Sequence, residues 1–394
     1  MSEASDGTIV LALNSGSSSL KLALYSFANG AGSKLANGAA EEIGSKDGRI
    51  RLRRGSEVLI DEARAFSGAT EAAQYLIALF LRNSLPAPRV VGHRIVHGGP
   101  HLREHQRITP DVLNQLEEAV VFAPLHLPRA LDVLRRATSD FPEAVQVACF
   151  DTAFHRTLPE YAARLPFPDA FWEKGLRRYG FHGLSCESII HALGNDVPGR
   201  VAIAHLGNGC SVTAVRNGVS VETTMGLTPM GGVMMGTRTG DLDPGVLLYV
   251  LQVERYEPEQ LQQLLNHRSG LLGVSGLSSD MRHLLEASQD NPQARMAVEM
   301  FCYQIRKSLG SMAAVLGGLD LFVFTGGIGE HAAPVRAKIC SGLEHLGILL
   351  DEQANQRGDS RISSATSTCA VRVIESDEDL QIARHSYRLA TDCT

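Results

Sequence analysis

Two short apolar runs, separated by a turn of small polar residues, open the chain. Residues 8–13 and 20–27 are mostly apolar or β-branched, and residues 14–19 contain only asparagine, serine and glycine. Apolar runs around a small-residue turn predict a β-hairpin. The same pattern returns at residues 201–215, around another glycine-rich turn. This repeat predicts that the chain is built from two related halves.

Helices are indicated by their end signals as well as by periodicity. A threonine and a proline at 109–110, and an asparagine and a proline at 291–292, are typical of helix starts. The second of these helices is expected to end at Gly317, and a last helix is expected over about 377–390. Four residues of the long helix are expected to face the core: Met296, Met300, Ile305 and Leu309.

Three glycine-rich turns lie next to predicted strands. A strand over 321–324 leads into Thr325–Glu330, and the turns at 14–19 and 207–211 have a similar composition. Small residues leave backbone amides accessible to phosphate, and a turn from a strand into a helix is a common phosphate site. A nucleotide held by several turns would explain all three, whereas each turn alone would also suit an ordinary loop.

Composition narrows the class of protein. The chain has 394 residues, 44% hydrophobic and 20% charged, with a formal net charge of −6. This length suits two domains, and the negative charge argues against binding nucleic acid or an anionic membrane. Seven cysteines without paired spacing indicate reduced thiols in a cytoplasmic protein. We expect neither a signal peptide nor a membrane span, since the first residues are polar and acidic and no long apolar run occurs.

Two known site types are excluded by spacing. A Walker A loop requires adjacent glycine and lysine, and no such pair occurs. The histidines stand in separate predicted turns rather than at the spacing of a zinc site.

Charged residues gather near the ends of predicted strands. Arg94 stands among histidines and glycines, and Asp151 follows a predicted strand at 145–149. Strand ends that lead into loops are favourable places for catalytic side chains. His182 lies in a glycine-flanked aromatic segment and could donate to a developing charge. The segment 231–245 combines five glycines with an arginine, so it is either a flexible surface loop or an anion site.

Taken together and in order, these motifs resemble the acetate kinases, which belong to the sugar-kinase/actin/heat-shock ATPase superfamily. The resemblance runs from residue 8 to about 390 and rests on nine segments: Asn14–Lys21 (NSGSSSLK), Gly92–Gly99 (GHRIVHGG), Ala123–His126 (APLH), Phe150–His155 (FDTAFH), Arg178–Gly183 (RYGFHG), His205–Gly209 (HLGNG), Met234–Pro244 (MMGTRTGDLDP), Ser278–Arg282 (SSDMR) and Phe324–Glu330 (FTGGIGE). It implies an α/β fold of two ribonuclease H-like domains with an active-site cleft between them. The acyl-substrate domain would comprise residues 1–150 and 380–394, closed by the C-terminal helix, and the nucleotide domain residues 151–379.

The resemblance also implies a reaction and residue roles. The reaction would be a reversible, Mg²⁺-dependent phosphoryl transfer from ATP to acetate, giving acetyl phosphate and ADP, with Mn²⁺ as another possible metal. The catalytic residues would be Asp151, His182 and Arg238, and the metal would be positioned by Asn14 and Glu378. The substrate would contact Arg94 through its carboxylate and Val96, Leu125, Phe181 and Pro229 through its methyl group. The nucleotide would contact Lys21, Ser17, Ser19, His205, Leu206, Gly207, Asn208, Gly209, Asp280, Met281, Arg282, Gly326, Gly327, Ile328, Gly329, Glu330 and His331. A homodimer is expected from the resemblance as well.

Two other interpretations stay open from the sequence. One is a propionate kinase of the same family, and the other is a non-catalytic, actin-like nucleotide-binding module. The presence of all the implied catalytic residues argues against the module. The chain departs from the family pattern at five positions: Leu127, Leu184, Cys186, Gly231 and Asp377. Leu127 and Leu184 are expected near the acyl pocket and the catalytic histidine. One methylene in an apolar pocket is worth only about 1–3 kcal/mol, so the choice between acetate and propionate stays open.

Overall fold

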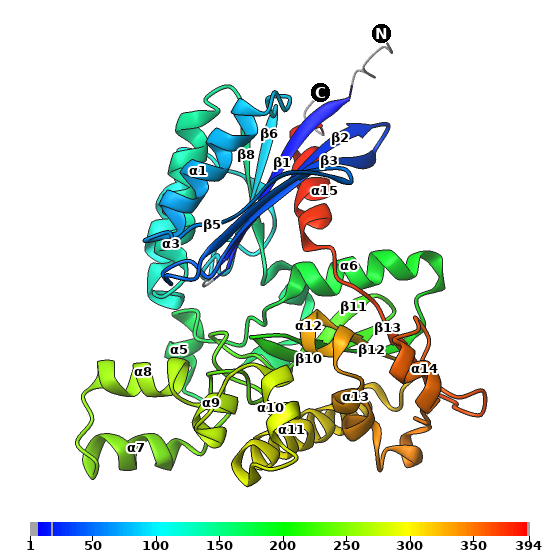
Figure 1. Cartoon of the computed structure of the whole chain (residues 1–394). Helices are drawn as coiled ribbons and strands as arrows, with labels where there is room; N and C mark the ends of the chain where they lie inside the picture. Colours follow the sequence, from blue (N-terminus) through cyan, green and yellow to red (C-terminus); the bar gives the residue numbers. More distant parts are fainter. Residues whose placement is uncertain (1–6, 17–18, 392–394) are drawn as a thin grey trace. The chain divides into compact units, whose positions relative to one another are not determined.

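Figure 1 shows the helices and strands of the computed structural model, which describes residues 7–16 and 19–391. Two units are distinguished. The first comprises the described residues up to Ala153 together with those from Asp377, and the second comprises Phe154–Ser376. The boundaries expected from the sequence, after 150 and before 380, lie a few residues from these.

The first unit is built on an eight-stranded sheet in the order β5-β4-β3-β2-β1-β6-β8-β7. Its strands are β1 (Thr8–Ser15), β2 (Leu20–Ala28), β3 (Ala31–Glu41), β4 (Arg49–Arg54), β5 (Glu57–Ala63), β6 (Val90–Ile95), β7 (Gln106–Arg107) and β8 (Val145–Phe150). Strands β1 and β2 form the predicted antiparallel hairpin. Strands β1, β6 and β8 run parallel, so their carboxyl ends meet at one edge, where ligands bind in sheets of this kind.

Helices cover both faces of this sheet (Figure 1). The helices of the first unit are α1 (Ala69–Arg82), α2 (Pro110–Glu118), η1 (Ala119–Phe122), α3 (Leu127–Asp140) and α15 (Glu378–Thr391). Apolar residues of α1 and α3 pack against Leu11, Leu13 and Leu22 of the sheet. The last helix, α15, packs on β1, β6 and β8. Glycine is required beneath it, because a Cβ at Gly92 would lie 2.1 Å from Ser386 Oγ.

The second unit repeats the central topology of the first. Its five-stranded sheet has the order β11-β10-β9-β12-β13, with β9 (Arg200–Leu206), β10 (Cys210–Arg216), β11 (Val219–Thr223), β12 (Leu321–Thr325) and β13 (Ala370–Val373). In both sheets an antiparallel meander of three strands is followed by two parallel strands beside the first. This shared order confirms the two related halves and the ribonuclease H-like fold class.

Most helices of the second unit lie between β11 and β12 or follow β12. The helical elements of the second unit are η2 (Ala153–Thr157, which begins at the last residue of the first unit), α4 (Glu160–Ala163), α5 (Asp169–Glu173), α6 (Gly183–Leu193), η3 (Gly194–Asp196), α7 (Pro244–Gln252), α8 (Pro258–His267), α9 (Gly270–Ser275), α10 (Met281–Ala287), α11 (Pro292–Leu316), α12 (Gly326–His331), α13 (Ala333–Cys340), η4 (Glu344–Leu346) and α14 (Glu352–Arg357). Among the described residues, no helix has the length and apolar character needed to cross a membrane.

The predicted helix ends are confirmed. Thr109 accepts a hydrogen bond from the Val112 amide at the start of α2, and Asn291 does the same for Ala294 at the start of α11. Gly317 ends α11 in the left-handed conformation, with φ of 72°.

The predicted core face of α11 is only half correct. Ile305 and Leu309 are buried, but Met296 and Met300 are exposed. The five-residue step from Met300 to Ile305 turns about 140° beyond one full helical turn, so the two pairs point in different directions.

Three departures from the family pattern are core residues. Leu127, at the start of α3, packs with Ile95 and Phe150 in the first unit. Leu184 and Cys186 lie in the first turns of α6 and are completely buried. Their side chains therefore face the hydrophobic interior.

Candidate active site

A buried ion pair lies where β6 and β8 end in the first unit. Asp151 directly follows β8, and its amide donates to the Ile95 carbonyl over 3.0 Å. Its Oδ2 accepts hydrogen bonds from Arg94 Nε at 3.0 Å and Arg94 Nη2 at 2.5 Å. The side chain of Arg94 is 15% exposed and that of Asp151 is 1% exposed. Burial lowers the pKa of Arg94, but the carboxylates of Asp151 and Glu378 outweigh it and hold that pKa above its usual value.

Asn14 joins this ion pair to the start of α15. Its Nδ2 donates to Glu378 Oε2 at 3.1 Å and to Asp379 Oδ1 at 3.0 Å. Its Oδ1 accepts from Arg94 Nη1 at 3.3 Å. Acidic residues are stabilised in the first turn of a helix, because the backbone amides there carry partial positive charge. The first unit thus gathers an arginine, an asparagine and three carboxylates at one edge of its sheet.

Asp379 was not predicted as a site residue. Its carboxyl pKa is raised by burial, and the charges of Glu378 and Asp377 add to this, while Asn14 and Lys21 act in the opposite direction. A sequence signal existed, because residues 377–379 are all acidic, but acids at a helix start also have an ordinary structural explanation.

The oxygen atoms of this group fit a divalent metal ion. Magnesium prefers a few carboxylate and amide oxygens, completed by water and phosphate. Glu378, Asp379 and the side-chain oxygen of Asn14 supply such donors within one hydrogen-bonded group. Burial raises the pKa of Asp379, and Glu378 and Asp377 add to this, so a bound cation beside these carboxylates would stabilise their charged form.

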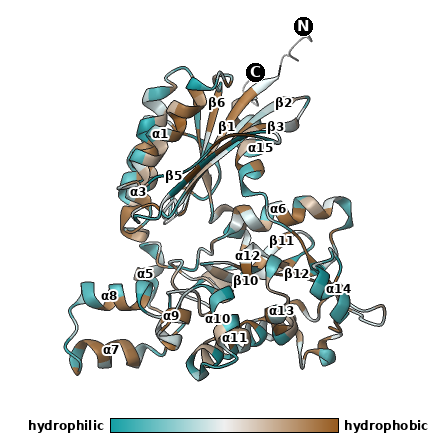
Figure 2. Ribbon diagram, in the orientation of Figure 1, coloured by the Kyte–Doolittle hydropathy of each residue, from teal (hydrophilic) through white to brown (hydrophobic). Residues whose placement is uncertain are grey.

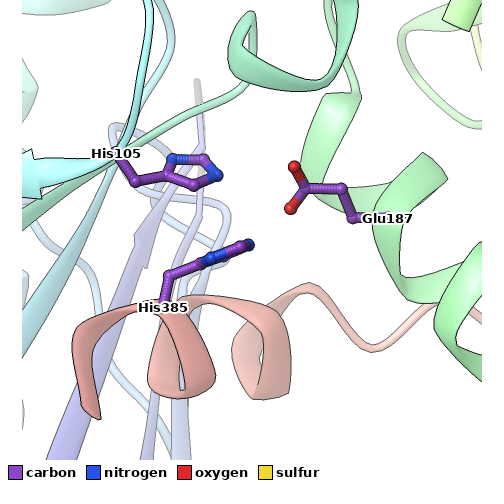
Figure 3. Close-up of side chains that lie close together, drawn as sticks. All are labelled: His105, Glu187 and His385. Atoms are coloured by element: carbon purple, nitrogen blue, oxygen red, sulfur yellow. The ribbon is translucent and has the colours of Figure 1, made fainter. Parts of the chain in front are cut away.

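Two histidines of the first unit, His105 and His385, have side chains that lie close together (Figure 3). His105 Nδ1 accepts a hydrogen bond from the amide of Phe150 at 2.9 Å. The rings of His105 and His385 have centroids 4.0 Å apart. Because His385 belongs to α15, the pair connects this helix to the residue that precedes Asp151. Glu187, also drawn in Figure 3, belongs to the second unit.

The other predicted residues of the first unit are distributed around these groups. Val96 is buried just after β6, and Leu125 is half-buried in the segment before α3. Lys21 is exposed on β2 directly opposite Asn14. The carbonyl of Ser19 accepts from the Gly16 amide at 2.8 Å and closes the hairpin turn. Ser17 lies outside the described residues.

In the second unit His182 is held at the N-terminus of α6. Its backbone is left-handed, with φ of 59°, which is uncommon for residues other than glycine. Its Nδ1 lies 3.0 Å from Ser211 Oγ on β10. Its ring stacks on that of His205, with centroids 4.1 Å apart, and His205 Nδ1 lies 2.8 Å from Ser185 Oγ.

Arg238 and His182 flank the backbone of Gly209. A Cβ at Gly209 would lie 3.2 Å from His182 Nε2 and 3.4 Å from Arg238 Nη1, so glycine permits both side chains to lie against the turn. Arg238 Nη1 also donates to the carbonyl of Pro229 at 3.0 Å. An arginine fork and an imidazole beside exposed backbone form a suitable site for a phosphoryl group.

The loop that carries Arg238 is fixed by hydrogen bonds. Met235 donates to the Arg238 carbonyl at 3.1 Å, and the Gly232 amide donates to Asp241 Oδ1 at 2.7 Å. A Cβ at Gly270 of α9 would lie 2.2 Å from the Met235 carbonyl oxygen. The glycines here allow backbone segments to pack closely, which favours the anion-site interpretation over a flexible surface loop.

Three of the predicted nucleotide segments lie together in the second unit. Strands β9 and β12 pair so that His205 is opposite Thr325. Gly326, with φ of 75°, lies against Leu206, because a Cβ there would be 2.7 Å from the Leu206 oxygen. The amide of Gly236 donates to the Asn208 carbonyl at 3.4 Å, and a Cβ on Gly236 would lie 3.5 Å from the Ser279 oxygen. The tip Gly207–Gly209, the start of α12 and the segment before α10 are therefore neighbours.

Several of these predicted contact residues have structural partners of their own. Glu330 Oε1 accepts from the Gly326 amide at 2.8 Å and so caps α12, to which Gly327, Ile328 and Gly329 also belong. Asp280 caps α10 and pairs with Arg282 Nη2 at 2.9 Å. Met281 is buried and His331 is exposed. Phe181, of the predicted acyl pocket, is also buried.

Arg336 was missed as a residue that supports this site. Its guanidinium is buried and donates to the carbonyls of Gly329 and Glu330, each at 2.9 Å. Its Nε donates to Asn355 Oδ1 at 2.7 Å. Burial lowers the pKa of this arginine. It therefore fixes the carboxyl end of α12 from the interior. Three of its four hydrogen-bond acceptors are backbone oxygens, which leave no local sequence pattern.

Known proteins match nearly the whole chain. The model of the acetokinase family matches residues 9–384. An acetate kinase of Nitrobacter hamburgensis is 44% identical over 395 residues, covering 97% of this chain and 96% of that protein. The crystal structure of a propionate kinase from Francisella tularensis has a TM-score of 0.89 and 35% identity, covering 97% of this chain and 100% of that one. The crystal structure of Porphyromonas gingivalis acetate kinase has a TM-score of 0.85 and 36% identity, covering 98% and 100%.

Proposed function

Because the chain belongs to the acetokinase family, we propose that it is an acetate kinase. It transfers the γ-phosphoryl group of ATP reversibly to acetate, giving acetyl phosphate and ADP. The observation that carries this proposal is the division of cationic groups between the units. Arg94 is held by Asp151 at the strand ends of one unit, and Arg238 and His182 flank Gly209 in the other.

The reaction joins two anions. One carboxylate oxygen of acetate attacks the γ-phosphorus, and the bond from that phosphorus to the bridging oxygen of ADP breaks, leaving its electron pair on ADP. A carboxylic acid has a reference pKa of about 4, so acetate is already ionised at neutral pH and needs no general base. The enzyme's task is therefore to position the reactants and to neutralise charge.

Arg94 binds the substrate carboxylate in this proposal, and Asp151 orients Arg94. The Asp151 oxygen accepts both bonds of the guanidinium fork, which fixes the plane of the cation. His182 and Arg238 donate to the oxygens of the phosphoryl group as charge spreads over them in the transition state. Asp151 thus acts by orientation rather than by removing a proton.

Asn14, Glu378 and Asp379 would hold Mg²⁺, or Mn²⁺, whose preferred ligands are similar. When bound, the ion supplies positive charge to the phosphate oxygens and orients them. The turn residues around Gly209 and the start of α12 bind the nucleotide through their backbone amides.

Acetate is proposed over propionate as the preferred substrate. The apolar residues expected around the methyl group, Val96, Leu125, Phe181 and Pro229, differ in burial and in the unit to which they belong. Leu127 and Leu184 are buried core residues, so they give no reason to expect an enlarged pocket. Because relatives of this chain include propionate kinases, propionate is the second candidate substrate.

The decisive experiment traps the product. Purified protein with ATP, Mg²⁺ and hydroxylamine should give acetohydroxamate from acetate, and kcat/KM should be compared for acetate, propionate and butyrate. The Arg94→Ala variant, prepared identically, controls for contaminating kinases and should give none. Absence of hydroxamate from both acetate and propionate would refute the proposed kinase activity and favour an actin-like nucleotide-binding module. A higher kcat/KM for propionate would establish the second candidate.

A homodimer through α7 is part of the proposal. This helix is brown in Figure 2 and contains no charged residue. Val246, Leu248 and Tyr249 are exposed, as are Leu242 and Val253 at its ends. An exposed apolar helix without charges can pack on its own copy across a two-fold axis without like-charge repulsion. Light scattering should give twice the chain mass, and Leu248→Glu should give a monomer; an unchanged dimer would move the interface elsewhere.

A reducing compartment such as the cytoplasm is the proposed location. The six cysteines within the described residues are buried thiols, as expected for a protein that does not rely on disulfides. Cell fractionation would test this, and recovery outside the cytoplasm would contradict it.

A further inference from the structure

His155 lies in η2 and has no part in the reaction as described so far. Its ring is buried, with 1% of the residue exposed. Its Nε2 lies 2.9 Å from the carbonyl oxygen of Phe181, and its Nδ1 lies 2.9 Å from Ser220 Oγ. A carbonyl only accepts, so Nε2 carries the hydrogen and donates. Nδ1 then accepts from the Ser220 hydroxyl, and both nitrogens have a fixed role.

The imidazole of His155 is neutral under physiological conditions. Burial lowers its pKa to about 4, although the Phe181 carbonyl and Glu187 act to raise it. A neutral ring in a single tautomer is a rigid hydrogen-bond donor. It is not a proton carrier at the pH where the enzyme would work.

The same ring packs against the turn before His182. Gly180 has φ of 75°, and a Cβ there would lie 2.6 Å from His155 Cγ and Cδ2. On the other side, the amides of Tyr179 and Gly180 both donate to the Gly226 carbonyl, at 3.0 and 3.3 Å. The turn from Tyr179 to Phe181 is therefore held from two directions.

Fixing the Phe181 carbonyl also fixes the backbone of His182. The carbonyl of residue 181 and the amide nitrogen of residue 182 share one planar peptide group. The φ angle of His182 is measured from that plane, and its value of 59° is one that needs support from the surroundings. A rotated peptide would carry the His182 ring away from Ser211 and from Gly209, which it now contacts or approaches.

We propose that His155 is a positioning residue for phosphoryl transfer, because its hydrogen bond to the Phe181 carbonyl holds the left-handed turn that aims His182. This inference rests on the proposed function, in which His182 contacts the phosphoryl group. His155 itself touches neither substrate nor nucleotide in this role.

Two substitutions separate the two hydrogen bonds of the ring. In His155→Gln the side-chain amide can replace Nε2–H and still donate to Phe181, whereas in His155→Asn it reaches only toward Ser220. We expect His155→Asn to lower kcat by about 10- to 100-fold, since a misplacement of about 1 Å has effects of this size. The KM values for ATP and acetate should change less than about threefold, and His155→Gln should retain most of the wild-type kcat.

A double-mutant cycle with His182→Ala tests whether the effect passes through His182. If it does, adding His155→Asn to His182→Ala should lower kcat no further. Equal reductions in both backgrounds, or equal kcat losses for the Gln and Asn variants, would overturn the proposal and leave a purely structural role. If His155→Asn does not fold, Ser220→Ala replaces it in the cycle. Ser220→Ala should lower kcat two- to fivefold in the wild-type background and should not lower it further in the His182→Ala background. An unchanged kcat for Ser220→Ala in the wild-type background would overturn the proposal. An inactive wild-type protein would refute the proposed function, whereas active wild type with an unaffected His155→Asn variant refutes only the positioning role.

Discussion

The ion pair between Arg94 and Asp151 leads to a quantitative prediction for Asp151→Asn. The substitution keeps the shape of the side chain and one oxygen acceptor but removes the negative charge. In the wild type that charge receives two hydrogen bonds from Arg94, at 3.0 and 2.5 Å, in a pair that is nearly buried. The variant therefore leaves a guanidinium in the interior with weaker compensation.

The expected loss in the free energy of unfolding is about 2–3 kcal/mol. Removing one partner of a buried ion pair costs about 3–5 kcal/mol when nothing replaces it. Here the asparagine oxygen still accepts a bond of about half the strength, and Glu378 Oε2 remains 3.9 Å from Arg94 Nε. Asp61→Asn is the matched control, because Asp61 accepts from Arg49 at 2.7 Å on the surface of the same unit. An exposed pair of this kind contributes little to stability, because solvent screens it, so Asp61→Asn should change the free energy of unfolding much less than Asp151→Asn.

The assay is urea unfolding followed by circular dichroism, fitted transition by transition because two units can unfold in separate steps. Kinetics should show a lower kcat and a higher KM for acetate, with no change in the shape of the pH profile between about pH 6 and 8, because acetate needs no general base. Equal stability losses for Asp151→Asn and Asp61→Asn would refute the argument from burial. A limb of the wild-type pH profile that disappears in Asp151→Asn would instead make Asp151 a proton donor or acceptor.

Three further predictions concern Arg238, His93 and Asp379. Arg238→Ala should lower kcat by at least about 100-fold while KM for ATP changes less than about threefold; the reverse result would assign Arg238 to nucleotide binding. Burial lowers the pKa of His93 from 6.5 to about 4, although its hydrogen bond to Gln146 acts to raise it. The folded protein therefore binds fewer protons than the unfolded chain, and its stability should fall as pH decreases from about 6.5 to 4. His93→Gln should show a shallower fall in Tm between pH 7.5 and 5, and equal slopes for variant and wild type would contradict this. Asp379→Asn should raise Tm in the absence of metal because it removes a buried negative charge that also lies beside Glu378 and Asp377. Mg²⁺ should raise Tm less in the variant than in the wild type, and an equal Mg²⁺ effect would remove Asp379 from the metal site.

The fold and the charged residues at strand ends were predictable because their signals are local. Apolar runs and small-residue turns mark β1, β2, β9 and β10, and parallel neighbours must end at a common edge. Arg94 lies near the end of β6 and Asp151 directly follows β8, and these strands are parallel neighbours, so the meeting of the two side chains follows from the topology. The exposed faces of Met296 and Met300 were not predictable in the same way, because apolar residues also occur on the outer face of a long helix.

The supporting residues were missed because the contacts through which they support the site are made to backbone carbonyls. His155 bonds to the carbonyl of Phe181, and Arg336 bonds to the carbonyls of Gly329 and Glu330. Every residue has such a carbonyl, so nothing in the identity of the acceptor marks the contact in advance. Asp379 was missed for a different reason. It belongs to a run of acidic residues that the sequence shows, but the ordinary preference of helix starts for acidic residues explains that run equally well.

The labelling rates of the buried cysteines can measure local opening of the structure around each of them. Cys149 lies in the first unit and Cys210, Cys302 and Cys369 lie in the second. Burial raises the pKa of Cys210, Cys302 and Cys369 to about 12, so the reactive thiolate of these residues is scarce in the folded state. Alkylation under native conditions is then limited by fluctuations that expose each thiol. Comparing the labelling rate of Cys149 with that of Cys210 by mass spectrometry would measure how often each half of the chain opens, without any introduced probe.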